Sequence, residues 1–212
     1  MVEPATDLAL LDAWRAGDAD AGNRLVTRHF RSVFRFFAGK VDDGVDDLVQ
    51  QTFLACVESE AGRGFRGEGS FVAYLLGIAR FKLLDRLRTR VPDQASLGAL
   101  ERGELSLHEI QASPSVVAVR GEEQRVLLVA LRRLPLDLQI ALELHYWEDL
   151  STAEIATVLD VPQGTIKTRL MRGRTKLREA IALVTPSEAL RESTLRDLEG
   201  WARAVRDFEQ PE

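Results

Sequence analysis

The stretch that decides the fold is residues 144–178, which read LHYWEDLSTAEIATVLDVPQGTIKTRLMRGRTKLR. Ser151 and Glu154 have the spacing of a capping box, the reciprocal pair of hydrogen bonds that begins many helices. A break at 160–162 follows, after which apolar residues recur at the spacing of a second helix. Its stripe consists of Ile166, Leu170, Leu177 and Ile181, with Gly173 allowing close approach of a neighbouring helix. Two short helices joined by a tight break predict a helix-turn-helix.

The second of these helices is strongly basic. Between Gln163 and Arg178 it has six basic residues and no acidic one. Lys167 and Arg174 lie on one flank of the apolar stripe, and Thr165, Arg169, Arg172 and Lys176 lie on the other. Such a helix can pack through its stripe and present both flanks to phosphates and base edges in a major groove. A solvated surface helix is the alternative, although it would normally mix charges of both signs.

The charge of the whole chain opposes simple DNA binding. Its 28 basic and 33 acidic residues give a formal net charge of -5. The acids are segregated, with four aspartates in 42–47 and seven acids against four arginines in 183–212. Long-range repulsion should offset the local attraction, so we expect weak binding to free DNA and a partner that presents this chain to it.

Length and composition limit the class of protein. With 212 residues and 45% hydrophobic content, the chain can form one or two compact domains. The one cysteine, Cys56, is expected in the core, and the three histidines are too scattered in the sequence to suggest a metal site. We expect no cofactor. No signal peptide and no run of eighteen apolar residues are apparent. We therefore expect a soluble cytoplasmic protein that is not inserted in the membrane.

Capping residues predict four helices in the first domain, residues 1–90. These helices begin at Thr6, Asp18, about Asp43 and Ser70. A glycine-rich loop at 62–69 precedes the fourth helix, which continues to about Arg90. This helix has a second basic face, which solvation alone could also explain. Its basic residues are Arg80, Lys82, Arg86, Arg88 and Arg90.

The rest of the chain divides into three parts. Periodicity fails over 91–115, which we interpret as a flexible linker with one short helix. Residues 116–182 form the second helical domain, and 183–212 form an acidic amphipathic extension. The predicted fold is therefore all-α, with two small helical domains and a C-terminal helix. That helix either packs as extra core or serves as an acidic regulatory tail.

Short motifs in both halves of the chain carry a family resemblance. The first half has DLVQQTFL at 47–54, FRGEGSF at 65–71 and LLGIAR at 75–80. The second half has LP at 134–135, EIA at 154–156 and GTIKTRL at 164–170. In this order across the linker, they resemble an extracytoplasmic-function (ECF, group IV) sigma factor of bacterial RNA polymerase. The resemblance covers about residues 8–90 and 116–182.

The resemblance implies a transcription initiation factor rather than an enzyme. Such a factor binds core RNA polymerase, recognises the -35 and -10 promoter elements and helps to melt the duplex at the nucleoid. Its helix equivalent to 46–53 docks on the clamp helices of the largest subunit. The implied polymerase contacts are Asp46, Asp47, Gln50 and Phe53. For Phe53, core packing is the alternative.

The resemblance also implies which residues contact each DNA element. The -35 element is bound as duplex, and the -10 element is bound as a melted single strand. The implied -10 contacts are Arg66, Tyr74, Arg80, Phe81, Lys82, Arg86 and Arg88. The implied -35 contacts are Thr165, Lys167, Thr168, Arg169, Arg172 and Arg174. The family usually has asparagine in place of Phe81 and tryptophan in place of Tyr74, which leaves the identity of the -10 bases open. An anti-sigma factor is a further implied partner.

Two other classes of protein are alternatives. An independent helix-turn-helix regulator would bind palindromic sites as a dimer, but this interpretation leaves the second basic helix unexplained. An enzyme is the other alternative. The aspartates in 42–47 lack the ligand spacing of a calcium loop, and no nucleophile–base set or phosphate-binding glycine motif is present.

Overall fold

The computed structural model describes residues 5–41, 43–59, 64–110 and 122–185, with isolated positions at 187, 188, 192 and 200. Across these residues the regular structure is helical, with one isolated antiparallel bridge between Ser106 and Pro135. The all-α prediction is confirmed. None of the described helices is long and apolar enough to cross a membrane.

The first four helices form an N-terminal group. They are α1 (Asp7–Arg15), α2 (Ala19–Ala38), α3 (Val45–Glu58) and α4 (Phe71–Arg88). The predicted caps of α1, α2 and α4 are confirmed, since the side chains of Thr6, Asp18 and Ser70 each accept a backbone N–H of the first turn. Helix α3 begins two residues later than expected, because Gly44 has a left-handed φ of 69° and takes the capping position.

The segment expected to link the domains is ordered over most of its described length. It contains the predicted short helix, α5 (Gln94–Glu101). Beyond α5, the chain forms backbone hydrogen bonds with the turn between the next two helices. Leu136 N donates to Leu105 O at 2.9 Å, and His108 N donates to Arg132 O at 3.0 Å. These bonds attach residues 103–110 to the second half of the chain.

The last four helices form a C-terminal group. They are α6 (Glu122–Leu131), α7 (Leu136–Tyr146), α8 (Thr152–Leu159) and α9 (Gln163–Val184). Helix α6 ends at Leu131, and Leu134, just before Pro135, is buried in the core. Helix α7 begins directly after Pro135, which lacks an N–H and suits a helix start.

Helices α8 and α9 form the predicted helix-turn-helix. Glu154 N donates to Ser151 Oγ at 3.2 Å, and Ser151 N donates to Glu154 Oε2 at 2.8 Å, so both bonds of the capping box are present. Asp160 ends α8 with a left-handed φ of 52°. A Cβ on Gly173 would lie 3.1 Å from Leu142, so glycine allows α9 to pack closely on α7.

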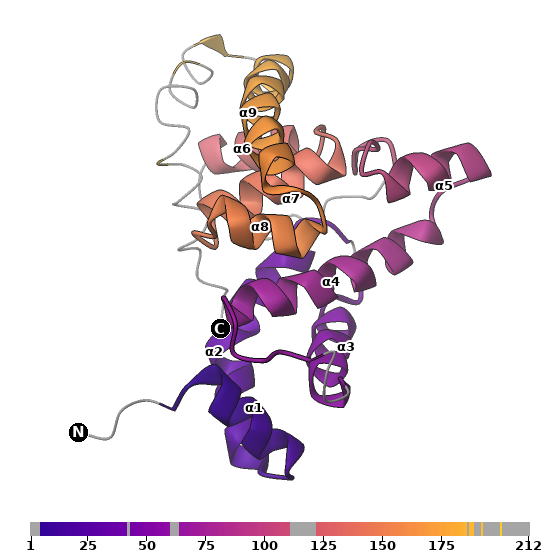
Figure 1. The fold of residues 1–212 in the computed structure, drawn as a ribbon. Coiled ribbons are helices and arrows are strands. Elements are labelled where there is room, and N and C mark those ends of the chain that lie inside the picture. Colours follow the sequence, from indigo (N-terminus) through magenta and orange to yellow (C-terminus); the bar gives the residue numbers. More distant parts are fainter. Residues whose placement is uncertain are drawn as a thin grey trace.

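The two groups pack against each other (Figure 1). Helix α4 lies between α3 and α8, and thereby joins the N-terminal group to the helix-turn-helix. Buried apolar side chains form one continuous cluster through both groups. The two helical units predicted from the sequence therefore share a core in this conformation.

The C-terminal extension falls almost entirely outside the described residues. Helix α9 continues to Val184, and Thr185 Oγ1 donates to Ile181 O at 2.7 Å at its end. The predicted amphipathic extension, 183–212, is described only at 183–185, 187, 188, 192 and 200, so its amphipathic face lies outside the described residues.

Candidate nucleic-acid interface

Helix α9 presents three of the predicted -35 contacts to solvent. Lys167, Thr168 and Arg172 are exposed, and Thr165 near the start of the helix is half-buried. The apolar stripe that begins at Ile166 is buried against the rest of the C-terminal group. This orientation leaves polar and cationic side chains in the position from which a recognition helix contacts a major groove.

The two other predicted -35 contacts are engaged within the C-terminal group. Arg169 forms an ion pair with Asp137 at the start of α7, and its side chain is only 18% exposed. Arg174 Nε donates to the hydroxyl of Tyr146 at 2.7 Å, and its guanidinium lies 5.6 Å from the centre of that ring. Both arginines hold α9 against α7, whereas the exposed residues remain available for DNA.

Asp137 links the recognition helix to the N-terminal group. Burial raises the pKa of its carboxyl, while the nearby charges of Arg169 and Arg80 act in the opposite direction. Arg80 belongs to α4, where burial lowers the pKa of its guanidinium and Asp137 opposes that change. One carboxylate of the C-terminal group therefore faces predicted DNA contacts from both α4 and α9.

Two aromatic -10 candidates occupy different environments on α4. Tyr74 is half-buried, with its hydroxyl 3.0 Å from Ser59 Oγ and its ring 5.7 Å from the ring of Phe65. Phe81 is 61% exposed, which is unusual for a large apolar side chain. Phe81 thus presents its ring to solvent, whereas Tyr74 braces the loop that precedes α4.

Acidic residues of this chain neutralise the arginines at the end of α4. Arg86 forms an ion pair with Asp43, just before α3. Arg88 pairs with Asp85 and lies 3.3 Å from a carboxylate oxygen of Glu101 in α5. These contacts reduce the positive potential that the sequence predicts for this helix. The two remaining cationic candidates are Lys82, which is half-buried, and Arg66, which is exposed.

The predicted polymerase contacts separate into surface and core residues. Asp46, Asp47 and Gln50 are exposed on α3. Phe53 is buried in the core at 4% exposure, so the structure favours the packing alternative for this residue. The exposed residues lie on the face of α3 that points away from the core.

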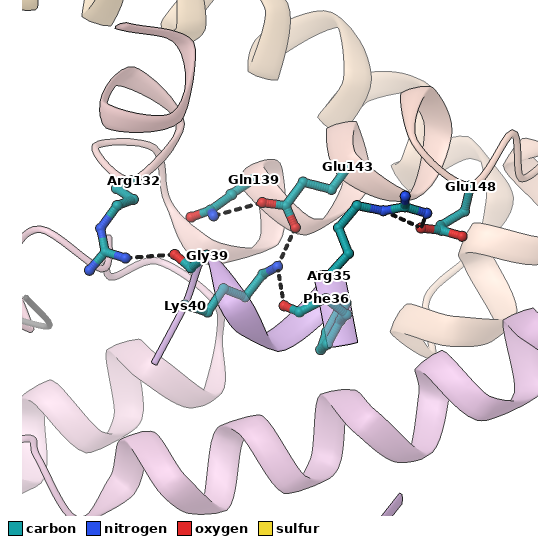
Figure 2. A network of polar contacts seen from close by, with 8 residues as sticks. All are labelled: Arg35, Phe36, Gly39, Lys40, Arg132, Gln139, Glu143 and Glu148. Carbon is teal, nitrogen blue, oxygen red and sulfur yellow. Dashed lines mark hydrogen bonds and ion pairs between the residues drawn. The ribbon is translucent and has the colours of Figure 1, made fainter. Parts of the chain in front are cut away.

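A polar network between the two groups was missed from the sequence (Figure 2). Lys40, two residues after α2, is fully buried and forms an ion pair with Glu143 of α7. Arg35 of α2 pairs with Glu148, just after α7, at 2.5 Å. The partners are separated by 103 and 113 residues in the sequence, so spacing could not reveal them.

One local signal could have indicated this network. Helix α7 is buried along nearly its whole length, yet its sequence LDLQIALELHY contains polar residues among the apolar ones. Asp137, Gln139 and Glu143 are all less than 10% exposed. Polar groups in such a helix require partners, because an unpaired buried charge is strongly destabilising.

The geometry defines a helix-turn-helix DNA-binding protein with a second cationic helix in a separate helical group. Family models agree: Sigma-70 region 2 matches residues 25–91, and Sigma-70 region 4 matches residues 124–177. The chain is 31% identical to the ECF RNA polymerase sigma-E factors of Salmonella typhimurium (strain LT2) and Escherichia coli (strain K12), over 82% of this chain and 93% of each relative. It is 30% identical to the factor of the same name from Haemophilus influenzae, over 85% of this chain and 98% of the relative. The chain belongs to the ECF sigma factor family of RNA polymerase.

Proposed function

We propose that this chain joins core RNA polymerase and directs it to promoters with two spaced elements, reading the -35 element with α9 and the -10 element with α4. The observation that carries this proposal is the presence of two cationic helices in two separate helical groups. The exposed face of α9 suits duplex DNA, and the exposed aromatic ring of α4 suits an unstacked base.

For the -35 element, we assign direct contact to Lys167, Thr168 and Arg172. Their exposure supports this choice. Arg169 and Arg174 would position α9 through Asp137 and Tyr146, and they could reach DNA only after releasing those partners. This division separates residues that contact DNA from residues that orient the helix.

For the -10 element, we assign Phe81 as a stacking surface for a base of the melted strand. Arg66 and Lys82 would contact the phosphates beside it. Arg86 and Arg88 would join them after leaving their acidic partners, and Arg80 would join them after moving away from the charge of Asp137. Base–aromatic stacking is worth about 1–3 kcal/mol per base, which offsets much of the cost of unstacking.

For the polymerase, we assign Asp46, Asp47 and Gln50 as contacts with the clamp helices of the largest subunit. Their exposure on one helix supports this surface. Phe53 would keep α3 seated on the core. We assign no catalytic chemistry to the chain, and we expect it to act on DNA at the nucleoid in the cytoplasm.

Regulation completes the proposal. We expect an anti-sigma factor as a partner that competes with DNA and polymerase for these surfaces. We also propose that the acidic extension after α9 modulates promoter binding. Deletion of residues 186–212 preserves α9 and should change transcription or the interaction with a partner. No change in either would refute a regulatory role of the extension.

The deciding experiment is in vitro transcription from a fragmented genomic template. Bacterial core polymerase is assayed with and without the full chain, and new transcript starts are mapped. New starts that share two spaced motifs would establish the function and define the promoter. Specific DNA binding by the chain alone, with no new starts, would favour the independent regulator instead.

A further inference from the structure

We propose that the chain rests in a closed form, in which an ionic latch of one buried and one half-buried pair holds the C-terminal group on the N-terminal group, and that promoter recognition requires this latch to open. The latch consists of the pairs Lys40–Glu143 and Arg35–Glu148 (Figure 2). The proposed function gives this closed form its consequence for DNA, but the existence of the latch does not depend on that function.

In the first pair, Lys40 and Glu143, further hydrogen bonds satisfy both charged groups. Lys40 Nζ donates to Glu143 and also to Phe36 O at 2.7 Å, and it lies 4.3 Å from the centre of the Phe36 ring. The other carboxylate oxygen of Glu143 accepts from Gln139 Nε2 at 2.8 Å. A buried ion pair persists only when further hydrogen bonds satisfy its atoms, and these residues provide them.

The second pair extends the latch along α2. Arg35 Nε donates to Glu148 Oε1 at 3.1 Å, and Ser32 Oγ donates to Glu148 Oε2 at 2.7 Å. On the other side of Lys40, Arg132 donates to Gly39 O at 2.6 Å. The polar contacts therefore join the end of α2 and the two residues after it to α7 and the segments that flank α7.

The closed form is incompatible with a complete promoter complex. The -35 and -10 elements lie about 25 base pairs apart, which is about 85 Å at about 3.4 Å per base pair. In the closed form, Arg169 of α9 pairs with Asp137, and that carboxylate also acts on Arg80 of α4. Helix α8 of the helix-turn-helix packs directly on α4 in this form, so α9 and α4 cannot occupy both elements at once and the groups must separate.

Closure also covers part of the proposed -10 surface. Helix α8 packs on α4, so one face of α4 is unavailable while the groups are joined. If only the open form binds the promoter, the apparent dissociation constant is the intrinsic one divided by the open fraction. A variant that weakens the latch should therefore bind promoter DNA more tightly.

Fluorescence energy transfer on the full chain tests the latch directly. Cysteines introduced at Thr27 of α2 and Ala153 of α8, both exposed and each five residues from the hydrogen-bonded pair Ser32 and Glu148, carry the dyes. The native Cys56 does not interfere, because it is buried and burial raises the pKa of its thiol to about 12. High transfer in the free chain is expected, and low transfer would overturn the proposal.

Charge reversal then identifies the contact. Arg35→Glu places two carboxylates together and should lower the transfer, whereas Arg35→Glu combined with Glu148→Arg should restore it. Arg31→Glu, at an exposed position one turn earlier on α2, is the matched control and should leave transfer unchanged. Equal transfer in the wild type and in Arg35→Glu would overturn the latch. Far-ultraviolet circular dichroism checks helix content, and Glu148→Gln replaces any reversal that unfolds the chain.

The final measurement distinguishes this inference from the proposed function. Holoenzyme containing Arg35→Glu should bind a duplex fragment carrying the mapped promoter at least about fivefold more tightly than wild type, while Arg31→Glu should not. Unchanged binding by Arg35→Glu would overturn the inhibitory role of the latch. If energy transfer responds to charge reversal at Arg35 but the chain never binds polymerase, the latch is supported and the proposed function as a sigma factor is refuted.

Discussion

Lys40 and Glu143 form an ion pair between the end of α2 and the middle of α7, and their side chains are 0% and 4% exposed. Burial lowers the pKa of Lys40, while the adjacent carboxylate of Glu143 opposes that change. The pair buries a positive charge of the N-terminal group and a negative charge of the C-terminal group in the core that both groups share. Each charge is tolerated there because the other is present, which couples the packing of the two groups.

Removal of one partner should destabilise the closed form strongly. We expect Glu143→Ala to cost about 3–5 kcal/mol, because it leaves the Lys40 charge buried and uncompensated. Urea unfolding followed by circular dichroism measures the loss. Glu179→Ala, at an exposed position on α9, is the control and should change stability by less than about 0.5 kcal/mol.

Replacement of both partners separates burial from charge. The double variant Lys40→Met, Glu143→Leu keeps apolar volume at the site and should be as stable as the wild type or more stable. A double variant as unstable as Glu143→Ala would show that shape, rather than charge compensation, governs this contact.

The recognition helix offers a comparison between two arginines. Arg172 is exposed, so Arg172→Ala should weaken promoter binding by holoenzyme by about 1–3 kcal/mol and leave the melting temperature unchanged. Arg169→Ala should weaken binding and also destabilise the chain by about 1–3 kcal/mol, because Asp137 loses its ion-pair partner. Binding titrations and thermal melts distinguish the two effects.

Glu179→Ala again supplies the baseline, since it removes a charge from the same helix. Both arginine variants should bind the promoter more weakly than this control. Transcription by Arg169→Ala and Arg172→Ala equal to that of Glu179→Ala would contradict the assignment of α9 to the -35 element.

Phe81 should act in promoter opening. Because its side chain is 61% exposed, Phe81→Ala should preserve the fold while removing about 1–3 kcal/mol of base stacking. Permanganate footprinting of open complexes measures the effect. Leu183→Ala removes another exposed apolar side chain, at the end of α9, and should not reduce opening. Equal opening by both variants would exclude stacking on Phe81.

Cys56 should be unreactive in the folded chain. Burial raises the pKa of its thiol to about 12, so the thiolate is scarce at neutral pH. Alkylation by iodoacetamide at pH 8 should be slow in the native protein and fast in denaturant. Rapid alkylation of the native protein would contradict burial.

The same pKa shift makes stability depend on pH. Because the pKa in the folded chain lies above the ordinary value of 9.0, the contribution of the protonated thiol to stability is fully present below about pH 9. That contribution should disappear as pH rises from about 9 to 12.

Local sequence signals predicted most of the helices. The capping residues Thr6, Asp18, Ser70 and Ser151 act within a few residues of themselves, so their roles could be inferred without tertiary structure. The start of α3 was less predictable, because the acidic residues before it resemble a helix start whereas Gly44 takes the capping position. The ordered part of the linker was also missed, since its hydrogen bonds join it to a distant turn.

The candidate site was predicted as a set of residues but not as an arrangement. The sequence indicated that Arg169 and Arg172 are on one flank of a basic helix. Only the structure shows that Asp137 engages Arg169 while Arg172 remains exposed. Phe53 illustrates the same limit, because a periodic pattern does not distinguish a core aromatic from one at an interface.

By itself, the sequence determined the helical class, the helix-turn-helix and its basic face, because caps and apolar periodicity depend on neighbours three or four residues away. The family assignment also followed from short contiguous motifs. Tertiary structure alone decided which charges are neutralised and how the two helical groups meet. Lys40 and Glu143 are 103 residues apart in the chain, and the attraction between them becomes specific only when folding excludes water from both.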